Sequence, residues 1–409
     1  MQELTGHLPP RANVARVDSG RRIVVLGVAA AATVASVMDA AFADAFGPSR
    51  LLMVLSFLFA LQALIQRRLL ITREVSLYGA FVAYLFVATL WTPDRLLALN
   101  TLFPAVDFLL ILLLFGCLSV YGGLRAVIAG TLAGFVLGAA IYAYEVRFPL
   151  VRPPDFSYNA LAAVYLCGLF CSLAYGWAKQ AKAVSLSLSL LFWLHVVATT
   201  SIKTNLGIVL GAGVATLFYL RHSLRLLGRS LIAIVAVGGL VAYAVISDQT
   251  ILSDLTAGAG RVSIGLQVLH SREDVSGYSG FDEREYWMAR GLEEWKYNPV
   301  FGHGVEAFRY SFGITSHSTP VDLLYNTGVI GFGLFYGIFA SVAARLLTAR
   351  RSSPRAPLML ITTILVCNVF VTLSGTVFYQ SFIAIFIAIS VAILRYLERR
   401  PDGVALTAK

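Results

Sequence analysis

Apolar runs of about 20 residues recur along the whole chain, and they restrict the possible folds more than any other feature. Such runs, repeated many times, are typical of a membrane protein whose helices cross the bilayer. Charged residues make up 13% of the chain, whereas a soluble domain has about 25%. We therefore expect an all-α polytopic integral membrane protein.

Twelve runs are candidate spans, and one long polar segment separates the ninth from the tenth. The spans are expected at 23–46, 51–66, 75–91, 97–120, 124–144, 158–177, 183–200, 204–220, 228–246, 319–345, 357–376 and 379–396. The chain is thus expected to comprise a tail at 1–22, a membrane domain of about nine spans at 23–246, a long loop at 247–318, a membrane domain of about three spans at 319–396, and a tail at 397–409.

Lysine and arginine are concentrated in alternate connections, which are expected to be cytoplasmic together with both termini. The long loop, 247–318, then faces the opposite side, which is the periplasm in a Gram-negative cell. Because the net charge of +10 sits mainly in these short clusters, nucleic-acid binding is not expected. Residues 1–22 are polar and contain four arginines, so the first span follows a tail rather than a cleavable signal.

The four cysteines lie inside apolar runs, and Cys167 and Cys171 are four residues apart. This spacing fits neither a disulfide framework nor a zinc site. They are expected to be small packing residues, and no structural metal is expected.

Lys203 lies on the expected outer side, between two apolar runs. One interpretation is that its ammonium only reaches the membrane interface. The other is that it holds an anionic ligand, in which case nearby hydroxyls such as those of Ser201 and Thr204 suit phosphate oxygens.

The segment FDEREYWMARGLEEWKYNPVFGHGVEAFR of the outer loop is expected to be helical until its Asn-Pro pair. Arg284, Trp287, Gly291 and Trp295 share one helix face, which predicts a helix lying on the membrane. Arg284 is either an interfacial anchor or, if it points inward, a planar partner for a phosphate.

His317 is followed directly by an apolar helix, with Pro320 suited to its first turn and Ser318 or Thr319 able to cap it. The imidazole is thus expected at the mouth of the membrane. A histidine accepts a proton near neutral pH, so it is either a general base or an ordinary interfacial residue.

His317 and Ser318, nine further residues, Gly328, two residues and Gly331 fit the pattern H-[N/S/Q]-x9-G-x-x-[G/T/Y]. Upstream, an arginine and a tryptophan precede N-P-x-x-G-x-G, which contains Gly302 and Gly304. Asn159 begins the sixth span. In these features the chain resembles the O-antigen ligase superfamily, which includes O-antigen and exopolysaccharide polymerases.

The resemblance implies a GT-C-like enzyme of the bacterial inner membrane, catalysing inverting, metal-independent glycosyl transfer without a cofactor. The implied donor is an undecaprenyl-pyrophosphate-linked glycan, and the acceptor is a growing polysaccharide or lipid A-core. His317 is the implied base, and Arg284 and Lys203 are the implied cations for the pyrophosphate. The implied substrate-binding residues are Ser201, Thr204, Asn159, Trp287, Gly302, Gly304 and Ser318.

One position departs from the family pattern, because Lys203 stands where S-R-[G/x] is common. Lysine keeps the charge but loses bidentate phosphate binding. Within the resembled family, a lysine followed by threonine at this place is more typical of exopolysaccharide polymerases than of lipid A-core ligases. The competing hypothesis is a flippase for lipid-linked sugars without transferase activity. It predicts charges buried within spans, and the expected spans contain few.

Overall fold

The computed structural model describes residues 19–41, 70–146, 158–198, 202–220, 279–349, 353–373 and 380–399, together with 54, 57, 58, 62 and 65. The longer regular elements within these ranges are all helices. They are α1 (Ser19–Ala41), α3 (Arg73–Ala88), α4 (Arg95–Tyr121), α5 (Leu124–Val146), α6 (Tyr158–Lys179), α7 (Lys182–Ala198), α8 (Ile202–Leu220), α11 (Ser279–Trp295), α12 (Ala307–Phe312), α13 (Thr319–Ala349), α14 (Arg355–Leu373) and α15 (Ser381–Glu398).

Ten of the twelve expected spans coincide with helices of the described part of the chain. The span at 228–246 and most of that at 51–66 lie outside it. Six of the described helices are long and apolar enough to cross a membrane. In the part that the structure describes, the chain therefore has the all-helical architecture of a multi-pass membrane protein, while the number of twelve spans stays a prediction. The six are Ser19–Met38, Arg95–Tyr121, Leu124–Tyr144, Leu161–Lys179, Thr319–Ala349 and Arg355–Leu373.

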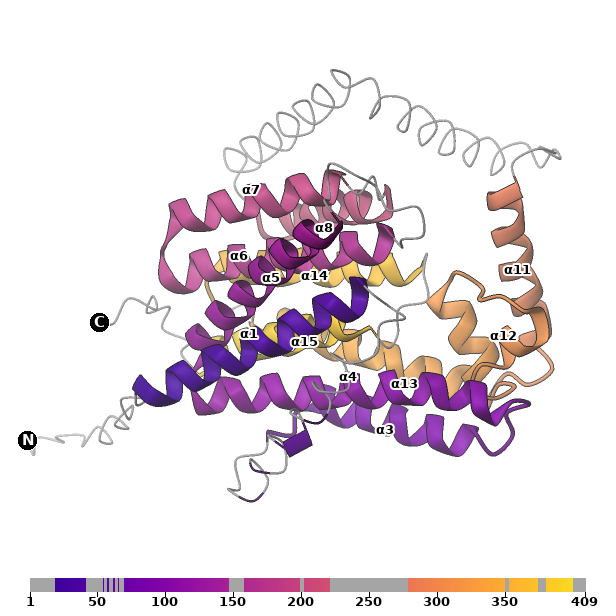
Figure 1. Cartoon of the computed structure of the whole chain (residues 1–409). Helices are drawn as coiled ribbons and strands as arrows, with labels where there is room; N and C mark the ends of the chain where they lie inside the picture. The colour runs from indigo at the N-terminus through magenta and orange to yellow at the C-terminus, as the bar shows by residue number, and fades with distance from the viewer. Residues whose placement is uncertain are drawn as a thin grey trace, which may run out of the picture.

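The long helices lie side by side in a bundle, and α11 and α12 lie together at one end of it (Figure 1). α11 runs crosswise to the bundle, as expected for a helix on the membrane surface. We call this the α11 end of the bundle. It also contains the starts of α6, α8, α13 and α15 and the ends of α3, α7 and α14. Of the expected long loop, 247–318, the described residues include both α11 and α12.

Small residues allow close packing between pairs of helices, as is common in membranes. Gly130 lies against the backbone of Leu26, which brings α5 onto α1. Gly211 lies against the backbone of Thr363, which brings α8 onto α14. α14 also packs against α13, the central helix, which contacts α3, α11, α12 and α15 as well.

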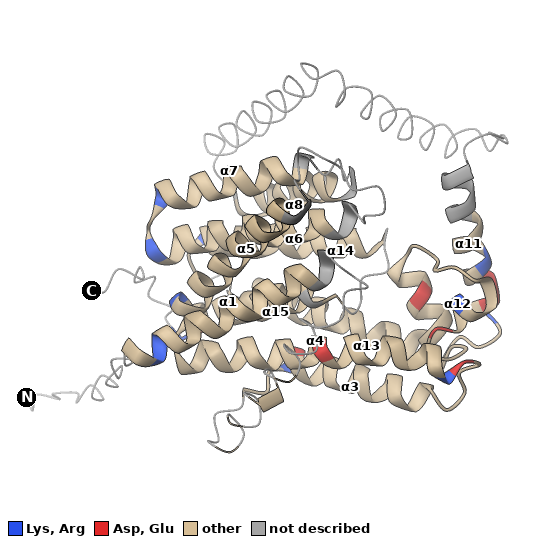
Figure 2. Ribbon diagram, in the orientation of Figure 1, with Lys and Arg blue, Asp and Glu red and all other residues tan. Residues whose placement is uncertain are grey.

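Basic residues mark the end of the bundle opposite to α11 (Figure 2). Lys179 ends α6 and Lys182 begins α7 there, and α1 begins with Arg21 and Arg22 in its first turn. Acidic and basic residues are mixed in α11 and α12 at the other end. This distribution matches the expected alternation of charge, but which end faces the cytoplasm stays a prediction.

α13 is broken at Gly328, whose backbone angles of φ 62° and ψ −167° are not helical. The segment Pro299–Gly304 fills the break. The N–H groups of His303 and Gly304 donate to the carbonyls of Tyr325 and Asn326 at 2.8 and 2.9 Å. In return, the N–H group of Val329 donates to the Pro299 carbonyl at 2.9 Å. The Asn-Pro segment and the glycine of the broken helix are therefore two halves of one structure.

Candidate active site

His317 lies in a tight turn immediately before α13. Its backbone has φ 57°, in the left-handed region that few residues other than glycine adopt. Such backbone strain costs about 1–3 kcal/mol and persists only where the surroundings enforce it. The imidazole-bearing side chain is half-buried. Its position is thus fixed by the fold of the turn and not by a flexible connection.

Three buried residues hold this turn in place. The N–H group of Ser316 donates to Oδ1 of Asp322 at 3.0 Å, so the carboxylate reaches back from the first turns of α13. Ser316 Oγ donates to the Ser318 carbonyl at 2.9 Å and accepts from the Ser318 N–H group at 3.1 Å. Ser316, Ser318 and Asp322 are 0%, 2% and 3% exposed. The backbone carbonyl and N–H group of Ser318 therefore both bond to the Ser316 hydroxyl within the protein.

One face of α11 packs against the segment around this turn. Gly291 lies against the side chains of Phe308 and Val321, where a larger residue would collide. One turn earlier, the ring of Trp287 packs on that of Phe312, with centroids 5.3 Å apart. One turn later, Nε1 of Trp295 donates to the Pro299 carbonyl at 3.1 Å. The shared helix face inferred from the sequence is thus the one that faces the protein.

α11 and the first half of α13 run in the same direction. Gly291 meets Val321, and three residues further along α11 the Glu294 carboxylate accepts a 3.4 Å hydrogen bond from the Tyr325 hydroxyl. The backbone of Arg284 is almost two turns before Gly291, on the side of α11 toward the start of α13. Its side chain lies outside the described part of the structure. The contacts between α11 and α13 therefore involve the part of α11 that follows Arg284.

Lys203 is at the α11 end of the bundle, but it belongs to a different part of it. Its backbone lies one turn before Gly207, which packs on Cys367 of α14. α8 thus reaches α13 mainly through α14. The side chain of Lys203 lies outside the described residues, as does Ser201. Thr204 is 1% exposed.

Asn159 begins α6 at the same end of the bundle, and its side chain also lies outside the described set. Arg284 thus belongs to the helix that packs against α13, and His317 to the turn before α13. The structure assigns Lys203 and Asn159 only to the same end. The roles expected for all four residues stay predictions.

Gly302 and Gly304 make their close approaches to protein backbone. Both have positive φ, at 71° and 106°. A side chain on Gly302 would collide with the Asn326 backbone, and one on Gly304 would collide with Thr92. Gly328 in turn lies against the Val300 backbone. The sequence predicted substrate binding at Gly302 and Gly304, and that role stays a prediction. The close approaches that the structure describes are to Asn326 of the broken helix and to Thr92.

Two further residues join the region of the break to α3 and to the turn that follows α3. The Tyr84 hydroxyl lies 2.9 Å from the Phe301 carbonyl and 3.0 Å from the Thr327 carbonyl. The Thr92 hydroxyl donates to the Val305 carbonyl at 2.5 Å. The sequence analysis missed both residues because no local pattern indicates these long-range hydrogen bonds.

Asp322 was also missed, although a local signal exists. Thr319 and Asp322 have the spacing [S/T]-x-x-[D/E] of a helix start, and such an acidic residue often bonds a backbone N–H group before the helix. Asn326 is similar in that its Oδ1 accepts from the Phe308 N–H group at 2.8 Å. Both residues are polar positions in an apolar helix, and each holds a neighbouring segment.

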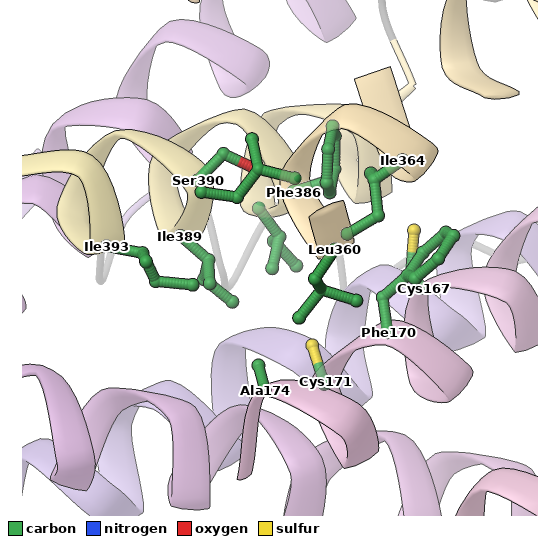
Figure 3. A pocket seen from close by; sticks show the side chains of 12 residues that line it. Cys167, Phe170, Cys171, Ala174, Leu360, Ile364, Phe386, Ile389, Ser390 and Ile393 are labelled. Atoms are coloured by element: carbon green, nitrogen blue, oxygen red, sulfur yellow. The ribbon is translucent and has the colours of Figure 1, made fainter. Parts of the chain in front are cut away.

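A separate cavity lies among α6, α14 and α15 and is lined almost entirely by apolar side chains (Figure 3). Cys167 and Cys171 line it, and Ser390 is its polar residue. All four cysteines are buried and free, as expected for packing residues. Among the described residues there is no cluster of histidine, cysteine and acidic side chains that could hold a metal ion. The residues that line this cavity include no charged side chain and no histidine.

Comparison with known proteins assigns a family to the region that contains the turn. A family model described as O-antigen ligase matches residues 186–336, which include Lys203, Arg284 and the whole pattern from His317 to Gly331. No curated protein matches the chain at a significant level. The resemblance expected from the sequence is thus confirmed, and it supports a membrane enzyme that transfers glycans, as a ligase or polymerase.

Proposed function

We propose that this chain, whose residues 186–336 match the O-antigen ligase family, is an inverting, metal-independent glycosyltransferase. In this proposal it moves a glycan from an undecaprenyl-pyrophosphate carrier to a sugar hydroxyl at the periplasmic face of the inner membrane. His317 is the general base, and Arg284 and Lys203 hold the pyrophosphate. Ser201, Thr204, Asn159 and Trp287 are the proposed neighbours of the substrates. The acceptor is either a growing polysaccharide or lipid A-core.

The observation that carries this proposal is the strained, half-buried position of His317. An ordinary interfacial histidine has no need of a left-handed backbone, because it can reach the membrane surface from a relaxed turn. Here, buried hydrogen bonds of Ser316 and Asp322 fix the turn. Strain of this kind is common at active sites, where it contributes to preorganisation.

The reaction requires one base and one anion-binding group. The acceptor hydroxyl oxygen attacks C1 of the donor sugar on the face opposite to the pyrophosphate, while its proton passes to the His317 imidazole. The bond between C1 and the pyrophosphate oxygen breaks, and its electron pair leaves with the lipid pyrophosphate. The positive charges of Arg284 and Lys203 stabilise the anion that develops. General base catalysis contributes about 10²–10⁴-fold to such a rate.

The test is a reconstituted reaction with purified protein in lipid and radiolabelled lipid-linked repeat units. We expect His317→Ala to lower the rate of product formation by about 10²–10⁴-fold and Arg284→Ala to abolish product as well. In cells, lipid-linked precursor should accumulate in both variants. His222→Ala is a matched control, because the sequence assigns that histidine to a connection on the opposite side of the membrane.

Normal product levels in both His317→Ala and Arg284→Ala would contradict the proposal. Movement of labelled lipid across vesicles by the wild-type protein, without any joining of glycans, would instead support the flippase hypothesis. Analysis of the product separates the two kinds of transferase. A polymerase leaves the extended glycan on the polyprenyl carrier, whereas a ligase transfers it to lipid A-core.

A further inference from the structure

An open hollow lies at the α11 end of the bundle, separate from the His317 turn. It is lined by Trp91, Asn298, Phe301 and His303, which come from the turn after α3 and from the segment that fills the break in α13. Its volume is about 520 Å³. This lies within the usual range of about 300–1,000 Å³ for small-molecule sites.

The hollow combines aromatic surface with polar groups and has no charged side chain in its lining. The rings of Trp91 and Phe301 meet edge to face, with centroids 6.3 Å apart and an angle of 78°. This arrangement leaves ring faces available, and the Phe301 side chain is 52% exposed. An uncharged ligand with both an apolar face and hydroxyl groups fits such a lining. A sugar ring has this chemistry, whereas a phosphate or a lipid chain does not.

The polar groups of the hollow are held in fixed orientations. The His303 ring stacks on that of Tyr325 with centroids 4.4 Å apart, and its Nδ1 lies 3.2 Å from the Tyr325 carbonyl. Because a carbonyl only accepts, Nδ1 carries the proton, and in the neutral ring Nε2 is then an acceptor. The indole N–H group of Trp91 is buried and has no hydrogen-bond partner among the described residues. The hollow thus offers an acceptor to a hydroxyl group, and the Trp91 ring contributes its apolar surface.

We infer that this hollow is a binding subsite for a neutral sugar of the acceptor glycan. The inference rests on the proposed function and specifies where the acceptor is held. Trp91 and Phe301 contact the apolar face of the sugar, and His303 accepts from one of its hydroxyls. The same segment that carries His303 also bonds Tyr325 of α13, about 9 Å along the helix from Thr319 at a rise of 1.5 Å per residue. Acceptor binding and the His317 turn therefore share one rigid support.

The test measures binding without turnover, in the His317→Ala background. Two probes are used: the oligosaccharide released by mild acid from lipid-linked precursor, and the core oligosaccharide of the same cells. We expect one of them to bind, and Trp91→Ala to weaken its binding about tenfold. Trp91→Phe keeps an aromatic ring and should stay within about threefold of the parent. In the active protein, Trp91→Ala should raise the KM for the acceptor about tenfold and change kcat less than twofold.

Tyr297→Ala is the matched control, because this aromatic side chain is 84% exposed close to the hollow and does not line it. It should bind the same probe as the parent, with the same affinity. If the parent and Trp91→Ala bind the probe with equal affinity, the inference is overturned and Trp91 is only an interfacial anchor. If neither probe binds to the parent, the inference is overturned too. The proposed function is tested separately, because normal product formation by His317→Ala would contradict it whatever the binding result.

Discussion

The two ends of α13 are fastened to the bundle by different means. At the α11 end, the helix is broken at Gly328. Neutral backbone groups of residues 299–304 make hydrogen bonds with the backbone groups of α13 that the break leaves without helical partners. At the opposite end, the fastening is ionic. Arg345 of α13 makes a bidentate pair with Glu398 of α15, at 3.0 and 2.9 Å. Its other nitrogen lies 3.6 Å from Glu74 of α3, which is 1% exposed.

The two kinds of contact have different roles: one fixes the backbone geometry of α13, and the other holds helices together. Non-helical backbone within a membrane protein is stable only where protein or water satisfies its polar groups, so the break at Gly328 requires an exact partner segment. Ion pairs place no such demand on backbone shape, and the Ser341 hydroxyl also donates to Glu74 at 2.8 Å. We conclude that the α11 end is built to fix a local geometry, whereas the opposite end joins three helices.

Among changes that test this comparison, the largest effect is expected from Gly328→Ala. The backbone angles of this residue suit essentially only glycine, and the added methyl group would collide with the Val300 backbone. We expect a loss of about 100-fold in transfer rate, since a displacement of about 1 Å in an active site costs that much. The measurement is product formation by the purified variant, with its helix content checked by circular dichroism.

Gly333→Ala provides the control on the same helix, because nothing lies within 4 Å of the position where its methyl group would be. It should be fully active. A fully active Gly328→Ala protein would show that the break does not position the site.

A smaller effect is expected from Asp322→Ala, which removes the acceptor for the Ser316 N–H group. A hydrogen bond to a charged group contributes about 1.5–3 kcal/mol, which corresponds to about 10–100-fold in rate if it holds the His317 turn. The transfer rate under saturating donor is the measurement.

Asp322→Asn keeps an oxygen at the same position and should recover most of this rate. This recovery distinguishes a positioning residue from a second base, because an asparagine cannot accept the proton. Equal losses in both variants would contradict the positioning role.

The smallest effect on catalysis, together with a large effect on stability, is expected from Arg345→Ala. It removes the arginine that pairs with the buried Glu74, although Arg395 still interacts electrostatically with that carboxylate. Breaking a buried ion pair costs at most about 3–5 kcal/mol. We expect a lower midpoint of thermal unfolding in detergent and an unchanged rate per folded molecule. Arg290→Ala removes an exposed pair with Glu294 and should change the free energy of unfolding by at most about 1 kcal/mol. A slower reaction in folded Arg345→Ala would show that the two ends are coupled.

Much of the helical architecture could be predicted from the sequence. A membrane helix needs a long apolar run, so the helices from α4 to α8 and α13 to α15 follow from composition along the chain. The stop at Asn298 and Pro299 was also predicted, and α11 ends at Trp295, just before it. In the candidate site, the sequence indicated His317 by its place before a helix and Arg284 by its helix face.

The tertiary structure decided how these pieces meet. A lone glycine in a helical pattern does not indicate where the helix breaks, and nothing near Gly328 in the sequence identifies Val300 as its neighbour. The sequence around Tyr84, Trp91 and Glu74 likewise does not identify their partners, which lie more than 200 residues away along the chain. The apolar pattern is local because burial in lipid acts on each segment separately. Hydrogen bonds and ion pairs between segments depend on packing, and packing is fixed only when the helices come together.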